Sequence, residues 1–409
     1  MTLDLTRLIR PGDTVMWGQS HAEPRTLIRR LVEQRHALGR IRLFLGIGLG
    51  NDLAPEQADA FDFLSYCGSG SNRPIAEAGV LDILPVHYSR LPHLMASGQL
   101  RIDVLFLQVS PPDEQGRYSL GMAREYLLGA IGRARVIVGE VHPDVPWTFG
   151  GPYLTETDFA ALIPSDAALP ESAPRKIGPV EEAIGRNVAS LIEDGATLQT
   201  GIGNIPDAAL MALSDRRDLG VHSGAIGEGL AALCAAGVVT NRRKSIDPGI
   251  TIGGALMGGA PLRAFAHRNP ALELRGTDYT HDPKVLGRIS RFVALNSAIE
   301  VDLSGQINSE TAGKRYLGAV GGIVDFLRAA GASAGGVPIV ALPSTGGGRS
   351  RIVPALTGPI SVPRSDSCVI VTEYGIADLR GLSLSQRIGK LIAVAHPDHR
   401  AALEEQSRA

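Results

Sequence analysis

The chain has 409 residues, of which 44% are hydrophobic and 20% charged, with 40 basic residues against 42 acidic ones. The formal net charge of −2 argues against a nucleic acid or an anionic membrane surface as the main partner. Because a single hydrophobic core stops growing at roughly 250 to 300 residues, we expect two domains, each with a core of its own.

The cysteines and the N-terminal segment predict the compartment. Cys67, Cys234 and Cys368 lie far apart, form no CxxC or Cys/His cluster and cannot all be paired, so we expect no metal and a reducing environment. The chain begins MTLDLTRLIRPGD, with no apolar leader, and no segment approaches the ~18 uninterrupted apolar residues that a membrane span needs. We therefore expect a cytoplasmic protein that is neither exported nor embedded in a membrane.

In chain order, short apolar runs end in glycine, proline or serine and alternate with stretches of helical pattern. The runs are residues 41–45, 104–109, 136–138, 338–342 and 368–372. This alternation is typical of βα units in a parallel sheet with helices on both faces. Residues 164–179 are rich in proline, serine and alanine, which indicates a crossing between domains. We place the boundary near residue 180 and predict α/β domains over residues 1–179 and 180–409.

A faint internal repeat supports this division. PGDTVMWGQSHAEP, residues 11–24, recurs as DGATLQTGIGNIP, residues 194–206, with one residue deleted. Each copy indicates a strand, a glycine turn and a helix opened by proline, which is tolerated in the first helical turn because its missing N–H would be unpaired there. Such a turn directs free backbone N–H groups at a ligand.

Glycine-rich loops are the main candidates for ligand binding. Residues 201–207, GIGNIPD, lack the third glycine of a dinucleotide fingerprint, and GIGLG at residues 46–50 has the wrong spacing. Further glycines cluster at residues 253–259, 321–325 and 344–351, none of them in a phosphate-loop motif. Together these loops suit a long, thin, phosphate-bearing ligand with Arg349 or Arg351 near its charged end, although each loop alone is more simply explained as a strand-end turn.

The order of these loops and their neighbouring residues resemble a known family. The strings are VLFLQVSPPDEQGRYSLG (104–121), GATLQTGIGNIPDAAL (195–210), DLGVHSG (218–224), LNSAIEVDLSGQIN (295–308), GAVGGIVDF (318–326), ALPSTGGGRSRIVP (341–354), VTEYGIADLRG (371–381) and LIAVAHPDHR (391–400). Together they closely resemble the acetyl-CoA hydrolase and 4-hydroxybutyrate CoA-transferase family, from about residue 10 to about residue 400. The resemblance implies two similar open α/β domains with mostly parallel sheets and covering helices, an active site in the cleft between them, and a homodimer.

The resemblance also implies a chemistry, with an acyl-CoA and a small carboxylic acid as substrates. In that family a glutamate carboxylate attacks the acyl-CoA, forms an acyl-glutamyl anhydride and then a glutamyl-CoA thioester, and passes CoA to the acceptor acid. Matched to this sequence, the CoA-binding loop falls on Gly201, Ile202, Gly203, Asn204 and Ile205. Further contacts are implied near Ile299, Gly322 and Gly346.

The sequence departs from the family at the nucleophile. Family members read HSE or a similar triplet, followed by an acid and a glycine, where this chain has HSGAIGEG at residues 222–229. The nucleophilic glutamate falls on Gly224, which has no side chain, so the family's covalent mechanism cannot run from this position. Glu228 matches the family's own second acid and is expected in a helix's first turn. If residues 224–228 were helical, Glu228 would lie about 6 Å along the axis from Gly224 and could reach into the space freed there.

Other side chains are candidates for the missing chemistry. Glu23, in the turn of the first repeat, either presents its carboxylate to the substrate or lies near its own helix's N-terminus. His222 could act as a general base on water, or be a packed residue at a strand end. Ser223 could donate a hydrogen bond to a thioester carbonyl. Gln108 could bind a carbonyl or a carboxylate, or simply close a turn. Gly46, the counterpart of position 224 in the first domain, offers no side chain either.

Three functions remain open from the sequence. The first is a divergent CoA-transferase for a small acid, a dicarboxylate among the candidates, in which another carboxylate or direct acyl transfer replaces the missing glutamate. The second is a thioesterase in which the void at Gly224 admits water activated by His222 or Glu228. The third is a non-catalytic CoA-binding protein.

Overall fold

The computed structural model describes residues 3–172 and 176–408. It divides into two compact units. Unit 1 comprises Met1–Ser172, Ile252–Thr280 and Arg315–Gly321, and unit 2 comprises Ala173–Thr251, His281–Lys314 and Gly322–Ala409. The first exchange between the units falls inside the stretch 164–179 that the sequence indicates as a crossing, and two later segments return to unit 1. Residues 173–175 of that stretch lie outside the described residues.

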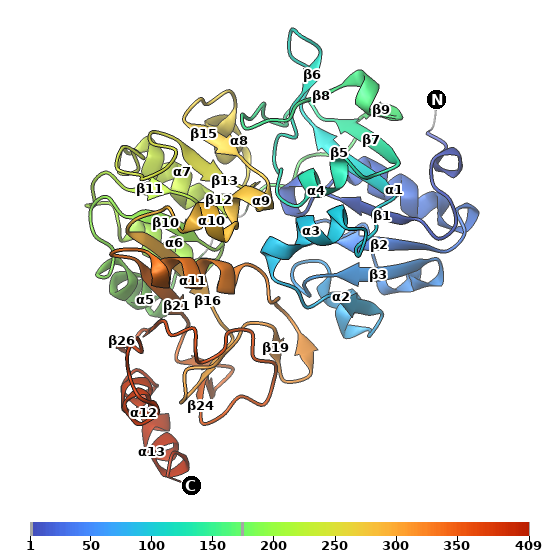
Figure 1. Cartoon of the computed structure of the whole chain (residues 1–409). Helices are drawn as coiled ribbons and strands as arrows, with labels where there is room; N and C mark the ends of the chain where they lie inside the picture. The colour runs from blue at the N-terminus through green and yellow to red at the C-terminus, as the bar shows by residue number, and fades with distance from the viewer. Residues whose placement is uncertain (1–2, 173–175, 409) are drawn as a thin grey trace. The chain divides into compact units, whose positions relative to one another are not determined.

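Unit 1 contains a seven-stranded sheet in the order β4-β3-β2-β1-β5-β7-β9, and every neighbouring pair is parallel (Figure 1). The strands are β1 (Thr14–Trp17), β2 (Ile41–Leu45), β3 (Phe61–Ser65), β4 (Leu81–Ile83), β5 (Val104–Val109), β7 (Val136–Val141) and β9 (Ala161–Pro164). The order runs outward from β1 in one direction and from β5 in the other. Open α/β sheets bind ligands at the carboxyl ends of the strands where the order reverses, which here are β1 and β5.

Unit 2 contains a six-stranded sheet in the order β11-β10-β16-β21-β25-β26, parallel except for the antiparallel edge strand β26. The strands are β10 (Thr197–Thr200), β11 (Gly220–Val221), β16 (Phe292–Ser297), β21 (Val337–Ala341), β25 (Val369–Thr372) and β26 (Gly375–Asp378). Its order reverses between β10 and β16. The first strand of each unit therefore lies at the reversal point of its sheet, and these two strands are the ones that the internal repeat identifies.

Helices cover both sheets (Figure 1). Those of unit 1 are α1 (Arg25–Gln34), α2 (Arg73–Glu77), α3 (Leu91–Ala96), α4 (Leu127–Ile131), α8 (Ala260–Ala266) and α9 (Thr277–Thr280). Those of unit 2 are α5 (Pro179–Ala189), α6 (Asn204–Met211), α7 (Glu228–Ala235), α10 (Pro283–Leu286), α11 (Ile323–Ala332), α12 (Leu384–Ala393) and α13 (Pro397–Gln406). In unit 2, α11 packs on β16 and β21, and α5 packs on β25.

The remaining described elements are short. The strands are β6 (Arg117–Tyr118), β8 (Leu154–Thr155), β12 (Ala225–Gly227), β13 (Thr251–Gly253), β14 (Ala255–Met257), β15 (Leu272–Leu274), β17 (Glu300–Asp302), β18 (Ile307–Asn308), β19 (Thr311–Ala312), β20 (Arg315–Tyr316), β22 (Thr345–Gly346), β23 (Arg349–Ser350) and β24 (Ile352–Val353). The 3-10 turns are η1 (Leu5–Arg7), η2 (Ser20–Ala22), η3 (Arg35–Ala37), η4 (Pro55–Asp59), η5 (Tyr88–Arg90) and η6 (Glu156–Asp158).

Each unit has a core of its own. Every residue of β5, VLFLQV, is buried, as expected for a central strand with both faces covered. In unit 2, Phe292 of β16 and Ile370 of β25 are each 0% exposed. The predicted α/β fold with two open, mostly parallel sheets is therefore confirmed.

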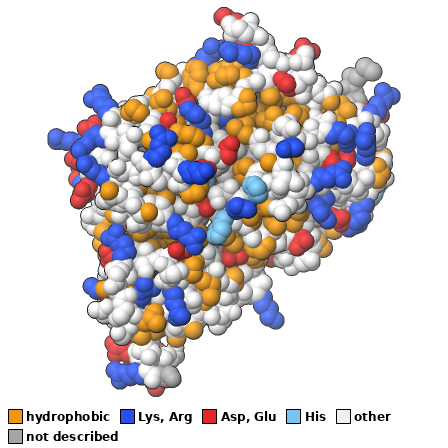
Figure 2. All heavy atoms as spheres, in the orientation of Figure 1, with side chains coloured by type: hydrophobic (Ala, Val, Ile, Leu, Met, Phe, Trp, Pro, Cys, Tyr) orange, Lys and Arg blue, Asp and Glu red, His pale blue; other side chains and the backbone are white. Residues whose placement is uncertain are grey.

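The surface, the cysteines and the helix lengths add three observations. Basic and acidic side chains are interspersed with hydrophobic ones over the face drawn in Figure 2. Cys67, Cys234 and Cys368 form no disulfide. Within residues 3–172 and 176–408, no helix has the length and apolar character that crossing a membrane requires.

Candidate functional site

The loop after β10 lies at the point where the strand order of the unit 2 sheet reverses. Gly203 is the N-cap of α6 and has φ +147° and ψ 177°, a backbone region that only glycine adopts readily. A side chain at Gly201 or Gly203 would meet nothing nearer than Pro206, 3.9 Å away, so the loop faces open space. Among the described residues, no side chain caps α6. Its first backbone N–H groups are therefore arranged as they are in anion sites at helix N-termini.

The other predicted CoA contacts lie in loops and at an element end of unit 2. Ile299 is half-buried and lies in the short loop between β16 and β17, and its backbone N–H donates to Asn308 O at 2.9 Å. Gly322 is the N-cap of α11. Gly346 ends β22, which is joined to β23 by a two-residue glycine turn with positive φ at both positions.

Arg351 lies against the backbone of Gly346. A Cβ atom at Gly346 would collide with the Arg351 guanidinium, so glycine at this position is what lets the cation lie so close. Arg351 is half-buried, whereas Arg349 is exposed. Of the two arginines named from the sequence, Arg351 thus has the more defined place beside a predicted ligand loop.

Gly224 lies in a loop between β11 and the short strand β12, and not in a helix. The helical spacing considered for residues 224–228 is wrong, because residues 225–227 are extended and place Ile226 in the core at 0% exposure. Helix α7 begins only at Glu228, which is exposed. The expectation that Glu228 is an acid in a helix's first turn is confirmed.

The space beside Gly224 is filled by a side chain that the sequence analysis did not single out. A Cβ atom at Gly224 would lie 2.8 Å from Cε1 and 3.1 Å from Nε2 of His281. One at Gly322 would lie 2.7 Å from the same Nε2. The His281 ring is also 4.4 Å, centroid to centroid, from the ring of Phe326. The imidazole thus lies between two glycine backbones and occupies the space into which a side chain at Gly224 would project.

Electrostatics keep this imidazole neutral. His281 is 4% exposed, and burial, together with the neighbouring His222, lowers its pKa to about 3. His222 is 0% exposed, and its backbone N–H donates to Leu198 O at 3.0 Å. The next residue, Ser223, donates its hydroxyl to Thr200 O at 3.1 Å and so ties this loop to the end of β10.

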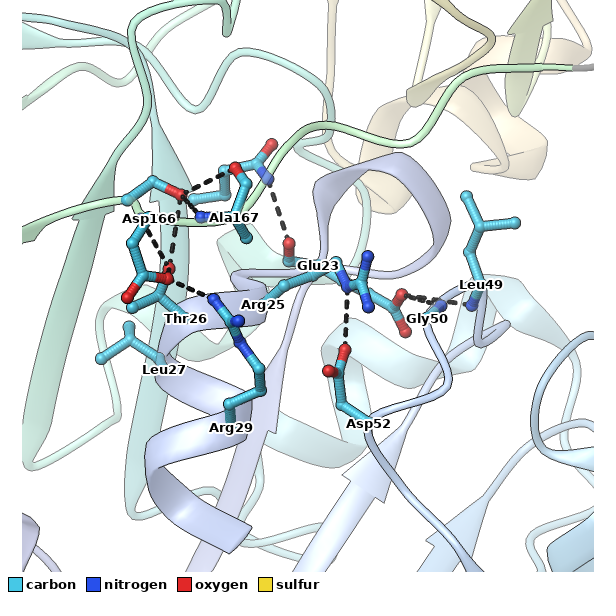
Figure 3. A network of polar contacts seen from close by, with 12 residues as sticks. Glu23, Arg25, Thr26, Leu27, Arg29, Leu49, Gly50, Asp52, Asp166 and Ala167 are labelled. Atoms are coloured by element: carbon cyan, nitrogen blue, oxygen red, sulfur yellow. Dashed lines mark hydrogen bonds and ion pairs between the residues drawn. The ribbon is translucent and has the colours of Figure 1, made fainter. Parts of the chain in front are cut away.

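Glu23 lies at the reversal point of the unit 1 sheet, in the loop between β1 and α1 (Figure 3). It is 7% exposed, and its Oε2 accepts hydrogen bonds from Gly50 N at 2.7 Å and Leu49 N at 3.2 Å. Burial outweighs these two bonds and raises the pKa of Glu23 to about 7. The charge of Asp52 raises it further, whereas Arg25, paired with Asp52 at 2.8 Å, lowers it.

The glycine stretch at residues 46–50 therefore holds a carboxylate of the protein itself. Gln108, at the end of β5, donates its amide N–H to Glu23 O at 3.0 Å and so joins the two strands that flank the reversal point. A small hollow beside them is lined by Gln19, Glu23 and Gly48, among others.

A second buried acid lies in unit 1, and the sequence analysis missed it. Glu125 is 3% exposed and has φ +32°, an uncommon conformation for a residue with a side chain. Its Oε2 accepts hydrogen bonds from Tyr88 OH at 2.5 Å and Gln19 Nε2 at 2.6 Å. Burial raises its pKa to about 7. No motif marks this residue, because its partners come from distant parts of the sequence.

Residues 2–153 match the acetyl-CoA hydrolase/transferase N-terminal domain, and residues 258–407 match the C-terminal domain of the same family. The chain belongs to the acetyl-CoA hydrolase/transferase family. Its enzymes include CoA-transferases that resemble this chain over nearly its whole length.

Two relatives and one solved structure show the extent of that likeness. The chain is 37% identical to 4-hydroxybutyrate coenzyme A transferase of Clostridium kluyveri, over 95% of this chain and 92% of that protein. It is 33% identical to succinyl-CoA:cyclohexane-1-carboxylate CoA transferase of Geobacter metallireducens, over 99% and 94%. The crystal structure of RipA from Yersinia pestis superposes with a TM-score of 0.93 at 31% identity, over 99% and 95%.

Proposed function

We propose that this member of the acetyl-CoA hydrolase/transferase family transfers coenzyme A between an acyl-CoA and a small carboxylic acid. The observation that carries the proposal is the coincidence of the open Gly201–Gly203 loop with the reversal point of the unit 2 sheet. Full-length similarity to CoA-transferases supports it. A cytoplasmic homodimer remains part of the proposal.

In this proposal the CoA moiety lies along the carboxyl edge of unit 2. Its phosphates bind the N–H groups at the start of α6, over the loop Gly201, Ile202, Gly203, Asn204 and Ile205. Arg351, held beside Gly346, supplies positive charge. Ile299 and Gly322 border the narrower part of the ligand, so that the thioester reaches the loop that carries Gly224.

We propose further that the acceptor acid itself attacks the thioester, because position 224 offers no carboxylate. The candidates named from the sequence are placed poorly for that attack. Glu228 is an exposed residue at the start of α7, and Glu23 is held by backbone N–H groups within unit 1. A void for hydrolytic water, which the thioesterase hypothesis required, is filled by His281.

The acid partner is proposed to be small and to include dicarboxylates. The Geobacter metallireducens relative is named for succinyl-CoA, the thioester of a dicarboxylic acid. A second carboxylate on the substrate would bind an arginine by paired, charge-assisted hydrogen bonds.

The direct test is to incubate the purified protein with acyl-CoA thioesters and a panel of isotopically labelled acids. We expect the label to appear in new acyl-CoA only when an acceptor acid is present. Free thiol released without an acceptor would instead identify a thioesterase. Calorimetric CoA binding without either product would identify a non-catalytic binding protein.

The binding loop has its own test in Gly203→Ala. A side chain at φ +147° strains the loop by about 1 to 3 kcal/mol, so CoA affinity should fall about tenfold or more. The matched control is Gly237→Ala, which also places a side chain at positive φ, with no atom within 4 Å, in the turn after α7. If both variants bind CoA as the parent does, the loop assignment is wrong.

A further inference from the structure

One face of the unit 1 sheet is exposed where β2, β3 and β4 lie side by side. The strand register places Arg42 opposite Asp62, and Leu64 opposite Asp82. Val80 comes just before β4 and shares a face with Asp82, because side chains two residues apart in a strand point the same way. These five residues form one continuous surface, which we call the β2–β4 face.

The same side of the sheet is covered further along β2 and open over the β2–β4 face. Phe44 is 0% exposed, and its ring lies edge-on to Tyr126 with 6.1 Å between the ring centroids. In contrast, Leu64 on the next strand is half-buried, and Val80 is 37% exposed. A hollow of about 500 Å³ lies over these two apolar residues. Parallel sheets normally have both faces covered, so this face is suited to a partner.

The charges of the β2–β4 face are balanced in sign. Arg40, at its border, already binds Asp62 with 2.6 Å between Nη2 and Oδ1. Arg42 and Asp82 are both exposed, and within residues 3–172 and 176–408 neither side chain has a hydrogen-bond or ion-pair partner. They lie two strands and two residues apart, or about 12 Å, which is too far for them to pair with each other. One positive and one negative charge therefore remain unpaired on a single face.

Such a face is complementary to itself. In a two-fold symmetric dimer, a residue i of one copy that meets residue j of the other implies a second, identical contact from j to i. A two-fold axis in the plane of the face, between Arg42 and Asp82, brings each arginine to the partner's aspartate. Both unpaired charges are then matched at once, whereas a partner surface of a single sign would repel one of them.

We propose that the β2–β4 face is the interface between two copies of this chain, in which Arg42 of each copy pairs with the partner's Asp82. The association also removes Leu64 and Val80 from water, which favours it. The inference deepens the homodimer of the proposed function by assigning the surface that forms it. It does not depend on the chemistry of CoA transfer.

The experiment measures the mass of the full-length protein by light scattering and by analytical ultracentrifugation over a range of concentrations. We expect the parent to have the mass of two chains. Arg42→Glu places two pairs of acids in contact across the interface, and Asp82→Arg places two pairs of arginines in contact. Because like charges in contact oppose association, each change should raise the dissociation constant of the dimer about 10²-fold.

An equimolar mixture of the two single variants gives the sharpest result. A two-fold interface between Arg42→Glu and Asp82→Arg chains contains one reversed ion pair and one native pair, and both are attractive. The mixture should therefore form a heterodimer with an affinity close to that of the parent, although each variant alone is monomeric. Arg133→Glu is the matched control, because it reverses an exposed arginine of unit 1 outside this face and should leave the mass unchanged.

Three results would overturn the inference. A monomeric parent would leave the hollow to a small ligand or to another protein. Single variants that remain as dimeric as the parent would place the interface elsewhere, and a mixture that stays monomeric would exclude the pairing of Arg42 with Asp82. Thermal melting shows whether each variant is folded, as expected for surface substitutions. CoA exchange is measured on the same samples, so a dimeric parent without exchange would refute the transferase and leave this interface standing.

Discussion

The two sheets carry opposite chemistry at matching positions. Gly46 follows β2 beside β1 in unit 1, and Gly224 follows β11 beside β10 in unit 2. A side chain at Gly46 would collide with Gln19 and Tyr126, whereas one at Gly224 would collide with His281. In unit 1, Gln19 supports a buried carboxyl group, while the space beside Gly224 in unit 2 holds a neutral imidazole.

The two halves of the repeat have diverged at this position. Both keep a glycine next to the strand that begins the sheet, so in both a side chain from elsewhere can reach the carboxyl edge. The buried titratable side chains near this edge differ between the two units in the direction in which burial shifts their pKa. Burial raises the pKa of Glu23 and Glu125 in unit 1 to about 7 and lowers that of His281 in unit 2 to about 3. Stability should therefore depend on pH with opposite sign in the two units.

The largest expected effect is a loss of folding stability at acid pH that depends on the titration of His281. Its folded pKa lies below the unfolded value of 6.5, so its contribution to stability is complete above pH 6.5 and is lost as the pH falls toward 3. The loss should be about 1.4 kcal/mol per pH unit over that range. In His281→Gln, urea unfolding followed from pH 7 to pH 4 should show a shallower fall than the parent. Parallel profiles would mean that His281 does not titrate as described.

The titration of Glu125 should change the free energy of unfolding with pH in the opposite direction, over a narrower pH range. Its folded pKa of about 7 exceeds the ordinary glutamate value of 4.5, so its contribution to stability is complete below pH 4.5 and is lost as the pH rises toward 7. Glu125→Gln keeps an oxygen for Tyr88 and Gln19 and removes the ionisation. The variant should gain stability relative to the parent between pH 4.5 and pH 7.5 in chemical unfolding. An equal difference at both pH values would contradict the burial argument.

A smaller effect is expected from Gly224→Ala, which tests how closely His281 packs beside this glycine. The new Cβ would lie 2.8 Å from His281 Cε1, and overpacking of this kind costs about 1 to 3 kcal/mol. The double variant with His281→Ala should lose less than the sum of the two single changes. Additive losses in thermal or urea unfolding would show that the two residues are not in contact.

The smallest effect is expected at Gly389, inside α12, where an added Cβ meets no atom within 4 Å. Gly389→Ala should stabilise unit 2 by about 0.5 to 1 kcal/mol, because alanine restricts the unfolded chain and favours the helix. It serves as the contrast to Gly224→Ala, since the same substitution is expected to have the opposite sign. A destabilised Gly389→Ala would show that open space around a glycine is a poor guide in this protein.

The sequence predicted the parts of the molecule that depend on local pattern. The five apolar runs fall on β2, β5, β7, β21 and β25, because buried parallel strands require continuous apolar segments. The repeat identified β1 and β10, whose glycine turns recur at fixed spacing. The family strings identified the loop around Gly224.

What the sequence did not predict depends on contacts between distant segments. His281 reaches Gly224 only because the start of α10 packs near α11, and no spacing rule links those segments. Glu125 becomes a buried acid only when Tyr88 and Gln19 fold around it. The sequence predicted a missing side chain at Gly224, whereas the His281 imidazole beside it could be found only in the structure.

The central claim is that this chain exchanges CoA without bonding covalently to either substrate. Mass spectrometry of the intact protein after incubation with acyl-CoA and a labelled acid tests it most directly. The account predicts labelled acyl-CoA in solution and an unchanged protein mass. A CoA or acyl adduct mapped to Glu23, Glu228 or His281 would contradict it.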